Sequence, residues 1–227
     1  MNSPRRIEVE WLDVLPAEDP RAQRSRRELA RVNALMANAG LVAGCLRARG
    51  TPASIVELGA GDGRFALRLA RALGSAPSGA TMTLVDRLPA LDADARRGLE
   101  ALGWRVEIAT ADVFEWLEAA GPHGAIACNL FLHHFEDEAL EQLLALASRR
   151  THRFVACEPR RSNIAGIGAR LLGAIGCGAV TRHDAVASVR AGFCDGELTA
   201  LWPRQAGWAT QERARGLFSH VFVAERS

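Results

Sequence analysis

The chain has 227 residues, which is enough for one complete hydrophobic core, so we expect a single main domain. Its formal net charge is +2, and this near-neutral balance gives no general field that would attract nucleic acid or an anionic membrane. The five cysteines show no C-x-x-C pairing and no apolar run is long enough to span a membrane, so we expect a cytoplasmic protein without disulfides or a metal site.

The first fifty residues are expected to be partly helical. Residues 1–20 contain three prolines and predict irregular structure. Apolar side chains then recur at a helical spacing over 21–39, and a second helix is expected over 41–48. We interpret residues 1–50 as a helical extension that packs against the main domain or covers a pocket as a lid. Its side chains that would face a substrate are Arg31 and Asn33.

A strand, a glycine turn and a helix follow between residues 55 and 70. The glycines stand at alternate positions, Gly59, Gly61 and Gly63, two residues after Glu57. Glycine permits positive φ and close approach of a ligand, and a turn of this kind before a helix presents backbone N–H groups to that ligand. A dinucleotide fingerprint would require glycine at position 64, where this chain has arginine.

The pattern E-L-G-x-G-x-G resembles the first motif of the class I S-adenosylmethionine (SAM) dependent methyltransferases. In that family the acidic residue and the glycine loop hold the amino-acid end of the cofactor. The alternative at this point is a glycine turn that only connects a strand to a helix.

Two further strands end close to an acidic residue, as this resemblance requires. The strand 81–86 ends in Asp86, which is placed to accept the hydroxyls of an adenosine ribose. The strand 104–110 is followed by Asp112, to which the resemblance gives the adenine amino group, although a helix cap is the alternative. The implied cofactor-binding set is Glu57, Gly59, Ala60, Gly61, Gly63, Asp86, Arg87, Asp112, Val113, Asn129 and Leu130.

Two adjacent histidines follow the fourth expected strand, 124–129. The ends of the first and fourth strands flank the switch region of a doubly wound sheet, so His133 and His134 are expected beside the transferred methyl group. Imidazole titrates near neutral pH, and either ring could act as a general base. The alternative is that a histidine only braces the loop. Further side chains that could face the substrate are Glu158, Arg160, Arg161 and Asn163. His183, in the later helical stretch, is an alternative base that would also face the substrate.

The rest of the chain completes the expected sheet. A fifth strand is expected over 153–158, then a partly helical stretch with a helix over 185–191 capped by Thr181 or Asp184. Two final strands, 207–213 and 217–225, form a closing hairpin. We therefore expect residues 51–227 to form an α/β, doubly wound, Rossmann-like domain with a seven-stranded sheet whose last strand is antiparallel.

The resemblance implies a methyltransferase that converts SAM to S-adenosylhomocysteine and methylates a small molecule. The D/N/S-P-P-Y/F motif of amino-group methylation is missing, since Asn129 is followed by Leu130. The leading hypothesis is O-methylation of a hydroxylated aromatic or polyketide-type metabolite in secondary metabolism. C- or N-methylation, a non-catalytic SAM-binding partner protein and a nicotinamide oxidoreductase are the alternatives. No nucleic-acid or membrane partner is expected, and the N-terminal helices could pair in a homodimer.

Overall fold

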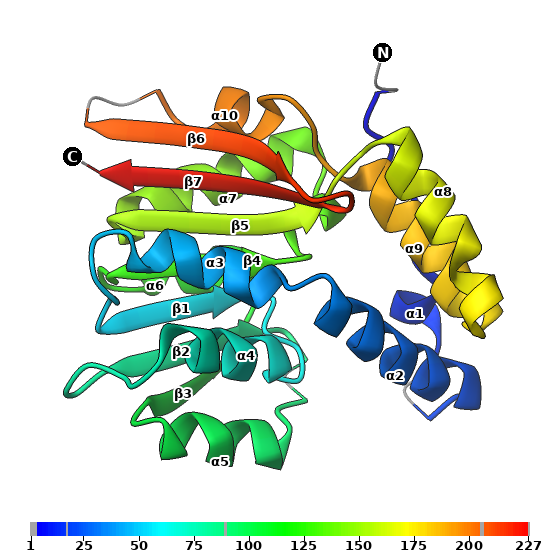
Figure 1. Cartoon of the computed structure of the whole chain (residues 1–227). Coiled ribbons are helices and arrows are strands. Elements are labelled where there is room, and N and C mark those ends of the chain that lie inside the picture. The colour runs from blue at the N-terminus through cyan, green and yellow to red at the C-terminus, as the bar shows by residue number, and fades with distance from the viewer. Residues whose placement is uncertain (1–3, 17, 89, 205–206, 227) are drawn as a thin grey trace.

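The computed structural model describes residues 4–16, 18–88, 90–204 and 207–226. They form a seven-stranded sheet, helices on both of its faces, and a helical cap at one end (Figure 1). The strand order is β3-β2-β1-β4-β5-β7-β6. The strands are β1 (Ser54–Leu58), β2 (Thr81–Asp86), β3 (Arg105–Thr110), β4 (Ala125–Asn129), β5 (Arg153–Pro159), β6 (Trp208–Arg215) and β7 (Ser219–Arg226).

The sheet confirms the predicted topology. Strands β1 to β5 pair in parallel, whereas β7 runs antiparallel to both β5 and β6. Strand β1 lies between β2 and β4, so the order reverses there and the carboxyl ends of β1 and β4 open a crevice. The expected antiparallel hairpin at the end of the chain is therefore present.

Two helical layers cover the sheet because its central strands are apolar on both faces. Every residue of β5 is buried. One face carries α3, α4 and α5, and the other carries α6, α7 and α10 (Figure 1). The bounds are α3 (Asn38–Arg47), α4 (Arg64–Leu73), α5 (Ala93–Ala101), α6 (Val113–Ala119), α7 (Asp137–Arg150) and α10 (Glu197–Leu201).

The cap stands at the carboxyl ends of the parallel strands and combines N-terminal helices with the helices that follow β5 (Figure 1). Helix α9 contacts α1, α2 and α8. Buried Glu28 of α2 ties the two halves together, because its Oε2 accepts hydrogen bonds from the Thr181 hydroxyl (2.6 Å) and the Gly178 N–H (2.8 Å). The cap elements are α1 (Trp11–Val14), α2 (Pro20–Leu35), α8 (Asn163–Leu171), the 3-10 helix η2 (Leu172–Ile175) and α9 (Ala179–Ala191). A second 3-10 helix, η1 (Leu132–His134), follows β4.

Several predicted boundaries in the cap were wrong. The prolines do not prevent a short helix, since α1 forms where the Asp184 carboxylate accepts the N–H groups of Trp11 and Leu12 (2.8 and 3.0 Å). Asp184 and Thr181 therefore do not cap α9; both lie buried inside it, after its N-cap residue Gly178. The first long helix ends at Leu35, because Ala37 has a φ of 53°.

The described part of the chain holds no single helix that is long and apolar enough to cross a membrane. Only α2 and α3 taken together pass that test by length and composition, and they are bent by 49°. The buried face of α3 packs into the main core.

Candidate active site

The glycine turn between β1 and α4 needs glycine for two reasons. Gly59, Gly61 and Gly63 have φ values of 72°, 53° and 73°, a region that side chains with a Cβ rarely occupy. A Cβ on Gly59 would lie 2.2 Å from the ring of Phe131, and one on Gly63 would lie 2.3 Å from Leu91. The turn is therefore fixed by its own conformation and by the side chains packed against it.

Glu57 is the penultimate residue of β1, just before this turn, and is 2% exposed. Among the described residues its Oε2 has no hydrogen-bond partner, and burial raises the pKa of the carboxyl well above its usual range. A buried acceptor without a partner is costly unless a ligand supplies the donor. The position fits the ammonium group at the amino-acid end of SAM.

Two further carboxylates stand at the same edge of the sheet. Asp86 accepts the N–H groups of Gly61 (2.9 Å) and Leu88 (2.8 Å), so it ties the glycine turn to the end of β2. Asp112 accepts the N–H of Phe114 (2.8 Å) and is the N-cap of α6. The helix-cap interpretation of Asp112 is thus correct. Each carboxylate retains acceptor capacity for the ribose or adenine that the resemblance assigns to it.

The remaining residues of the expected cofactor set surround these acids. Ala60 and Val113 are buried, whereas Arg87 is exposed. Asn129 ends β4 and accepts a hydrogen bond from the Asn38 side chain (2.9 Å). Leu130 follows with a φ of 53°, and its side chain lines the neighbouring cavity. Such a conformation is uncommon for a residue with a branched side chain. Leu130 adopts it between the expected cofactor residues and the cavity.

His133 is held by a buried carboxylate. Its Nδ1 lies 2.8 Å from Oε2 of Glu158, which is the penultimate residue of β5 and is fully buried. The other Glu158 oxygen accepts the N–H groups of Phe131 (3.1 Å) and Leu132 (3.0 Å). Glu158 therefore orients the ring and fixes the turn after β4, so it does not face the substrate as expected.

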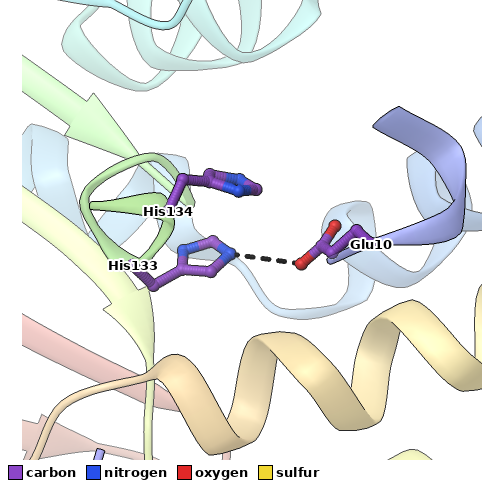
Figure 2. Close-up of side chains that lie close together, drawn as sticks. All are labelled: Glu10, His133 and His134. Carbon is purple, nitrogen blue, oxygen red and sulfur yellow. Dashed lines mark ion pairs between the residues drawn. The ribbon is translucent and has the colours of Figure 1, made fainter. Parts of the chain in front are cut away.

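The second nitrogen of His133 faces Glu10, a residue of the N-terminal segment. Nε2 lies 3.6 Å from the Glu10 carboxylate (Figure 2). This carboxylate also accepts a hydrogen bond from the Ser188 hydroxyl. Burial lowers the basicity of His133, but the two carboxylates outweigh it and raise the pKa of the ring to about 9. His133 is therefore protonated at neutral pH in the ligand-free protein.

His134 has the opposite electrostatic character. Its ring lies beside that of His133, with centroids 4.2 Å apart, and lines the cavity. Desolvation and the charge of His133 lower its pKa to about 4. The two adjacent histidines therefore carry different charges at neutral pH, one positive and one neutral.

The same three side chains could hold a divalent cation. Ligand atoms of Glu10, His133 and His134 lie within 4.8 Å of one another. Two imidazoles and a carboxylate are a ligand set that zinc accepts, with Glu158 as the outer carboxylate on one histidine. The proton that raises the pKa of His133 competes for the same nitrogen, because a metal ligand must be deprotonated.

A cavity of about 380 Å³ opens beside these histidines, under the helical cap. Its walls are largely apolar and come from α2, α8, η2 and α9. Its carboxylates are Glu10 and Asp184, and no arginine is among the described residues that line it. Ligand pockets of small molecules have this size and composition.

The predicted substrate residues divide between this cavity and its surroundings. Asn33 lines the cavity, whereas Arg31 lines a smaller cavity next to it. Asn163 is exposed at the start of α8, and Arg160 donates to the carbonyl of Gly216 (3.2 Å). His183 stacks on Trp11 with ring centroids 4.0 Å apart. None of these last three residues lines either cavity.

The sequence interpretation missed Glu10. It lies in a segment that we expected to be irregular, and no spacing relates it to the histidines. Only the docking of α1 on α9 brings it to His133.

Comparisons with known proteins agree with this geometry. Residues 55–153 match the family model of a methyltransferase domain. A search of curated protein sequences finds no significant match. Among solved structures, the plantazolicin methyltransferase BpumL in complex with SAH is 14% identical, with a TM-score of 0.65 and coverage of 92% of each chain.

Two larger proteins also share the fold. A candidate O-methyltransferase from Nostoc punctiforme is 18% identical, with a TM-score of 0.59 over 84% of this chain. An O-methyltransferase family protein from Burkholderia thailandensis is 20% identical, with a TM-score of 0.60 over 93% of this chain. The chain spans only 56% and 61% of the length of these two proteins.

The family match lies on the part of the chain that contains the glycine turn, the three acids and both histidines. Together with the seven-stranded sheet and its antiparallel β7, it confirms the resemblance and the cofactor that it implies, SAM. Residues 55–153 therefore match a methyltransferase domain, and the fold of the chain is similar to that of the SAM-dependent methyltransferases.

Proposed function

We propose that the protein transfers the methyl group of SAM to a hydroxyl of a small, uncharged aromatic molecule, with His133 as the general base. The observation that carries this proposal is the buried His133–Glu158 pair, whose remaining ring nitrogen points to Glu10 at one wall of a largely apolar cavity. The neighbours named as O-methyltransferases and the pyocyanin biosynthetic protein PhzM support an acceptor from natural-product metabolism.

Bound SAM supplies an electrophilic methyl group. Glu57 and the N–H groups of the glycine turn would hold its amino-acid end, Asp86 its ribose, and Asp112 with Val113 its adenine. Asn129 and Leu130 lie between this region and the cavity. Methyl transfer is an in-line displacement, so the main contributions of the protein are to orient the acceptor and to exclude water.

His133 is the better base of the two histidines. Its Nδ1–H is donated to Glu158, so that Nε2 carries the lone pair when the ring is neutral. A pKa of about 9 is close to that of a phenol, about 10, so proton transfer from the acceptor hydroxyl to Nε2 is nearly balanced. His134, with a pKa of about 4, is a much weaker base, and it contributes a neutral wall beside the acceptor.

The cavity also selects against charge. The Glu10 and Asp184 carboxylates would repel an acceptor that carries a carboxylate, and no described arginine is present there to pair with one. A neutral hydroxylated ring suits an apolar cavity with a few polar groups at one end.

Calorimetric titration with SAM, followed by assays with phenols, carboxylic acids and amines, tests the proposal. We expect SAM to bind, and neutral phenols to yield S-adenosylhomocysteine and an O-methylated product identified by its mass. Transfer to nitrogen or carbon would support the C- or N-methyltransferase alternative. SAM binding without transfer to any acceptor would favour a non-catalytic partner protein.

The pH dependence separates the two histidines. If His133 is the base, kcat rises with pH until it levels off above about 9, because the protonated ring must first lose its proton. If His134 is the base, kcat is independent of pH above about 5. His133→Asn should abolish this rise.

We also propose a cytoplasmic location, which is supported by the five free cysteines. A homodimer, the helical extension 1–50 as a separate lid, and residues 51–227 as the cofactor domain stay predictions.

A further inference from the structure

We propose that the methyl acceptor is an amphiphile whose uncharged aliphatic tail lies in a groove between α2 and η2. This inference rests on the proposed methyl transfer, since the hydroxylated ring of the same molecule would occupy the cavity beside His133. The proposed function describes only the hydroxylated ring of the acceptor, and this inference describes the remainder of that molecule.

The groove adjoins the acceptor cavity and shares three lining residues with it. A second cavity of about 100 Å³ adjoins the first, and both are lined by the apolar residues Val32, Leu35 and Ile175. The smaller cavity continues to Arg31 and Cys177 at the edge of the cap. A molecule longer than one ring system can therefore extend from the histidines along an apolar passage.

Two large aliphatic side chains at this passage are uncovered. Leu35, at the end of α2, is 82% exposed, and Ile175, at the end of η2, is 68% exposed. Single exposed apolar residues need no explanation, but these two belong to different elements and line the same cavities. An aliphatic tail between them would remove both from water.

The helix that forms one wall is unusually apolar for its position. Residues Asn163–Ile175 form an apolar segment whose only charged side chain is Arg170. Its inner stripe, Ala165, Ala169 and Leu172, lines the acceptor cavity. Helices that are apolar on most of their circumference are normally buried, so this wall is suited to contact an apolar ligand.

Two charged residues line the groove, Glu28 and Arg31, and neither opposes such a tail. Arg31 is exposed, so its guanidinium can stay in water. Glu28 is the carboxylate in its lining, and Arg24, Thr181 and the N–H of Gly178 all bond to it. The Arg24 guanidinium and these hydrogen bonds lower the pKa of Glu28 to about 2, although desolvation opposes the shift. The negative charge of Glu28 is thus already paired and hydrogen-bonded within the protein, so the ligand need not supply a polar group to it.

A series of 4-alkylphenols with tails of one to eight carbons tests the proposal. Dissociation constants are measured by calorimetry on the full chain loaded with S-adenosylhomocysteine, and kcat/KM is measured with SAM. We expect the affinity to rise about two- to fourfold for each added methylene until the groove is filled, as for burial of apolar surface. An affinity that does not depend on tail length would overturn the proposal.

A matched pair of variants locates the tail. Ile175→Asn should reduce the gain per methylene to below about 1.5-fold. Ile108→Asn should keep the full gain, because Ile108 is also exposed (43%) but lies on the edge strand β3 and lines neither cavity. If Ile175→Asn and Leu35→Asn both keep the full gain, the tail lies elsewhere and the proposal is wrong.

The two readouts separate this inference from the proposed function. A tail-dependent affinity without methyl transfer supports the groove and contradicts the O-methyltransferase proposal. Methyl transfer with an affinity independent of tail length supports the O-methyltransferase proposal and contradicts the groove. A dimer in sedimentation experiments whose formation is abolished by Leu35→Asn would assign the groove to a second copy and overturn the proposal.

Discussion

Nδ1 of His133 lies 2.8 Å from Oε2 of Glu158, and the two side chains are 3% and 0% exposed. The same carboxylate accepts two backbone N–H groups of the turn after β4. One buried acid therefore sets both the position of the turn and the charge of the ring, and the electrostatics of the site depend on it.

Replacing Glu158 with glutamine should move the pH profile. Gln keeps the size and an acceptor oxygen but removes the negative charge, so the pKa of His133 should fall from about 9 toward its ordinary value of 6.5. We expect the midpoint of the kcat–pH curve to move down and the plateau of kcat to fall about 10- to 100-fold. Affinity for SAM, measured by calorimetry, serves as the control and should be retained. An unchanged midpoint would contradict the orienting role.

The raised pKa of His133 also predicts how stability depends on pH. Because the folded-state pKa (about 9) exceeds the ordinary value of 6.5, protonation stabilises the fold fully below about pH 6.5, and this contribution is lost as pH rises to 9. The free energy of unfolding should fall by about 3 kcal/mol over that interval. Urea denaturation of the wild type and of His133→Asn measures it. The difference in unfolding free energy between the two proteins should shrink with increasing pH. A difference that stays constant would refute the raised pKa of His133.

Binding of SAM should release a proton from Glu57. Burial keeps the pKa of Glu57 well above its usual range in the free protein, and the cationic amino group of the cofactor favours the ionised form. Calorimetry in buffers with different ionisation enthalpies should therefore show proton release near pH 6.5, and affinity should increase with pH. Glu57→Gln should remove the release and weaken binding about 10- to 100-fold. The exposed Glu107→Gln on β3 is the control that should preserve both.

Gly59→Ala should damage the glycine turn, whereas Gly44→Ala should not. The first substitution forces a Cβ to a φ of 72° and against the ring of Phe131, so we expect a loss of about 2–4 kcal/mol in unfolding free energy and weaker SAM binding. Gly44 lies inside α3 with nothing within 4 Å of an added Cβ. Alanine there should stabilise the protein by about 0.5–1 kcal/mol. Thermal unfolding and calorimetry of both variants check the contrast.

Zinc should inhibit the enzyme, and chelation should not. The ligand atoms of Glu10, His133 and His134 are close enough to take one ion, but methyl transfer as proposed needs Nε2 of His133 free. We expect EDTA to leave kcat unchanged and micromolar Zn²⁺ to lower it, more strongly at higher pH, where His133 loses its proton. Loss of activity on chelation, restored by a divalent metal, would instead make this cluster a cofactor site.

Features encoded by neighbouring residues were predictable. The apolar strands, the alternate glycines and the acids after β2 and β3 follow from local patterns, and the sheet confirms their order. Asp112 shows the limit of such reasoning, because its cap role is visible in the structure while its cofactor role rests on the resemblance.

Features that depend on side-chain direction were not predictable. By sequence, Arg160 and Arg161 were candidates to face the substrate. In the structure Arg161 is buried and pairs with Glu197, whereas Arg160 bonds to a turn. Likewise α9 begins at Ala179, and Thr181 in its first turn bonds to Glu28 of α2, which is 153 residues away in the sequence. Sequence spacing carries no information about such pairings.

The placement of Glu10 has a consequence for how the protein is made. Residues 6–12 bond to Asp184, Ser188 and Arg190, so they acquire these partners only after α9 has left the ribosome. The sheet up to β5 can form before that moment. During synthesis, the cofactor region can therefore assemble first, while the wall that carries Glu10 closes over His133 as one of the last events of folding.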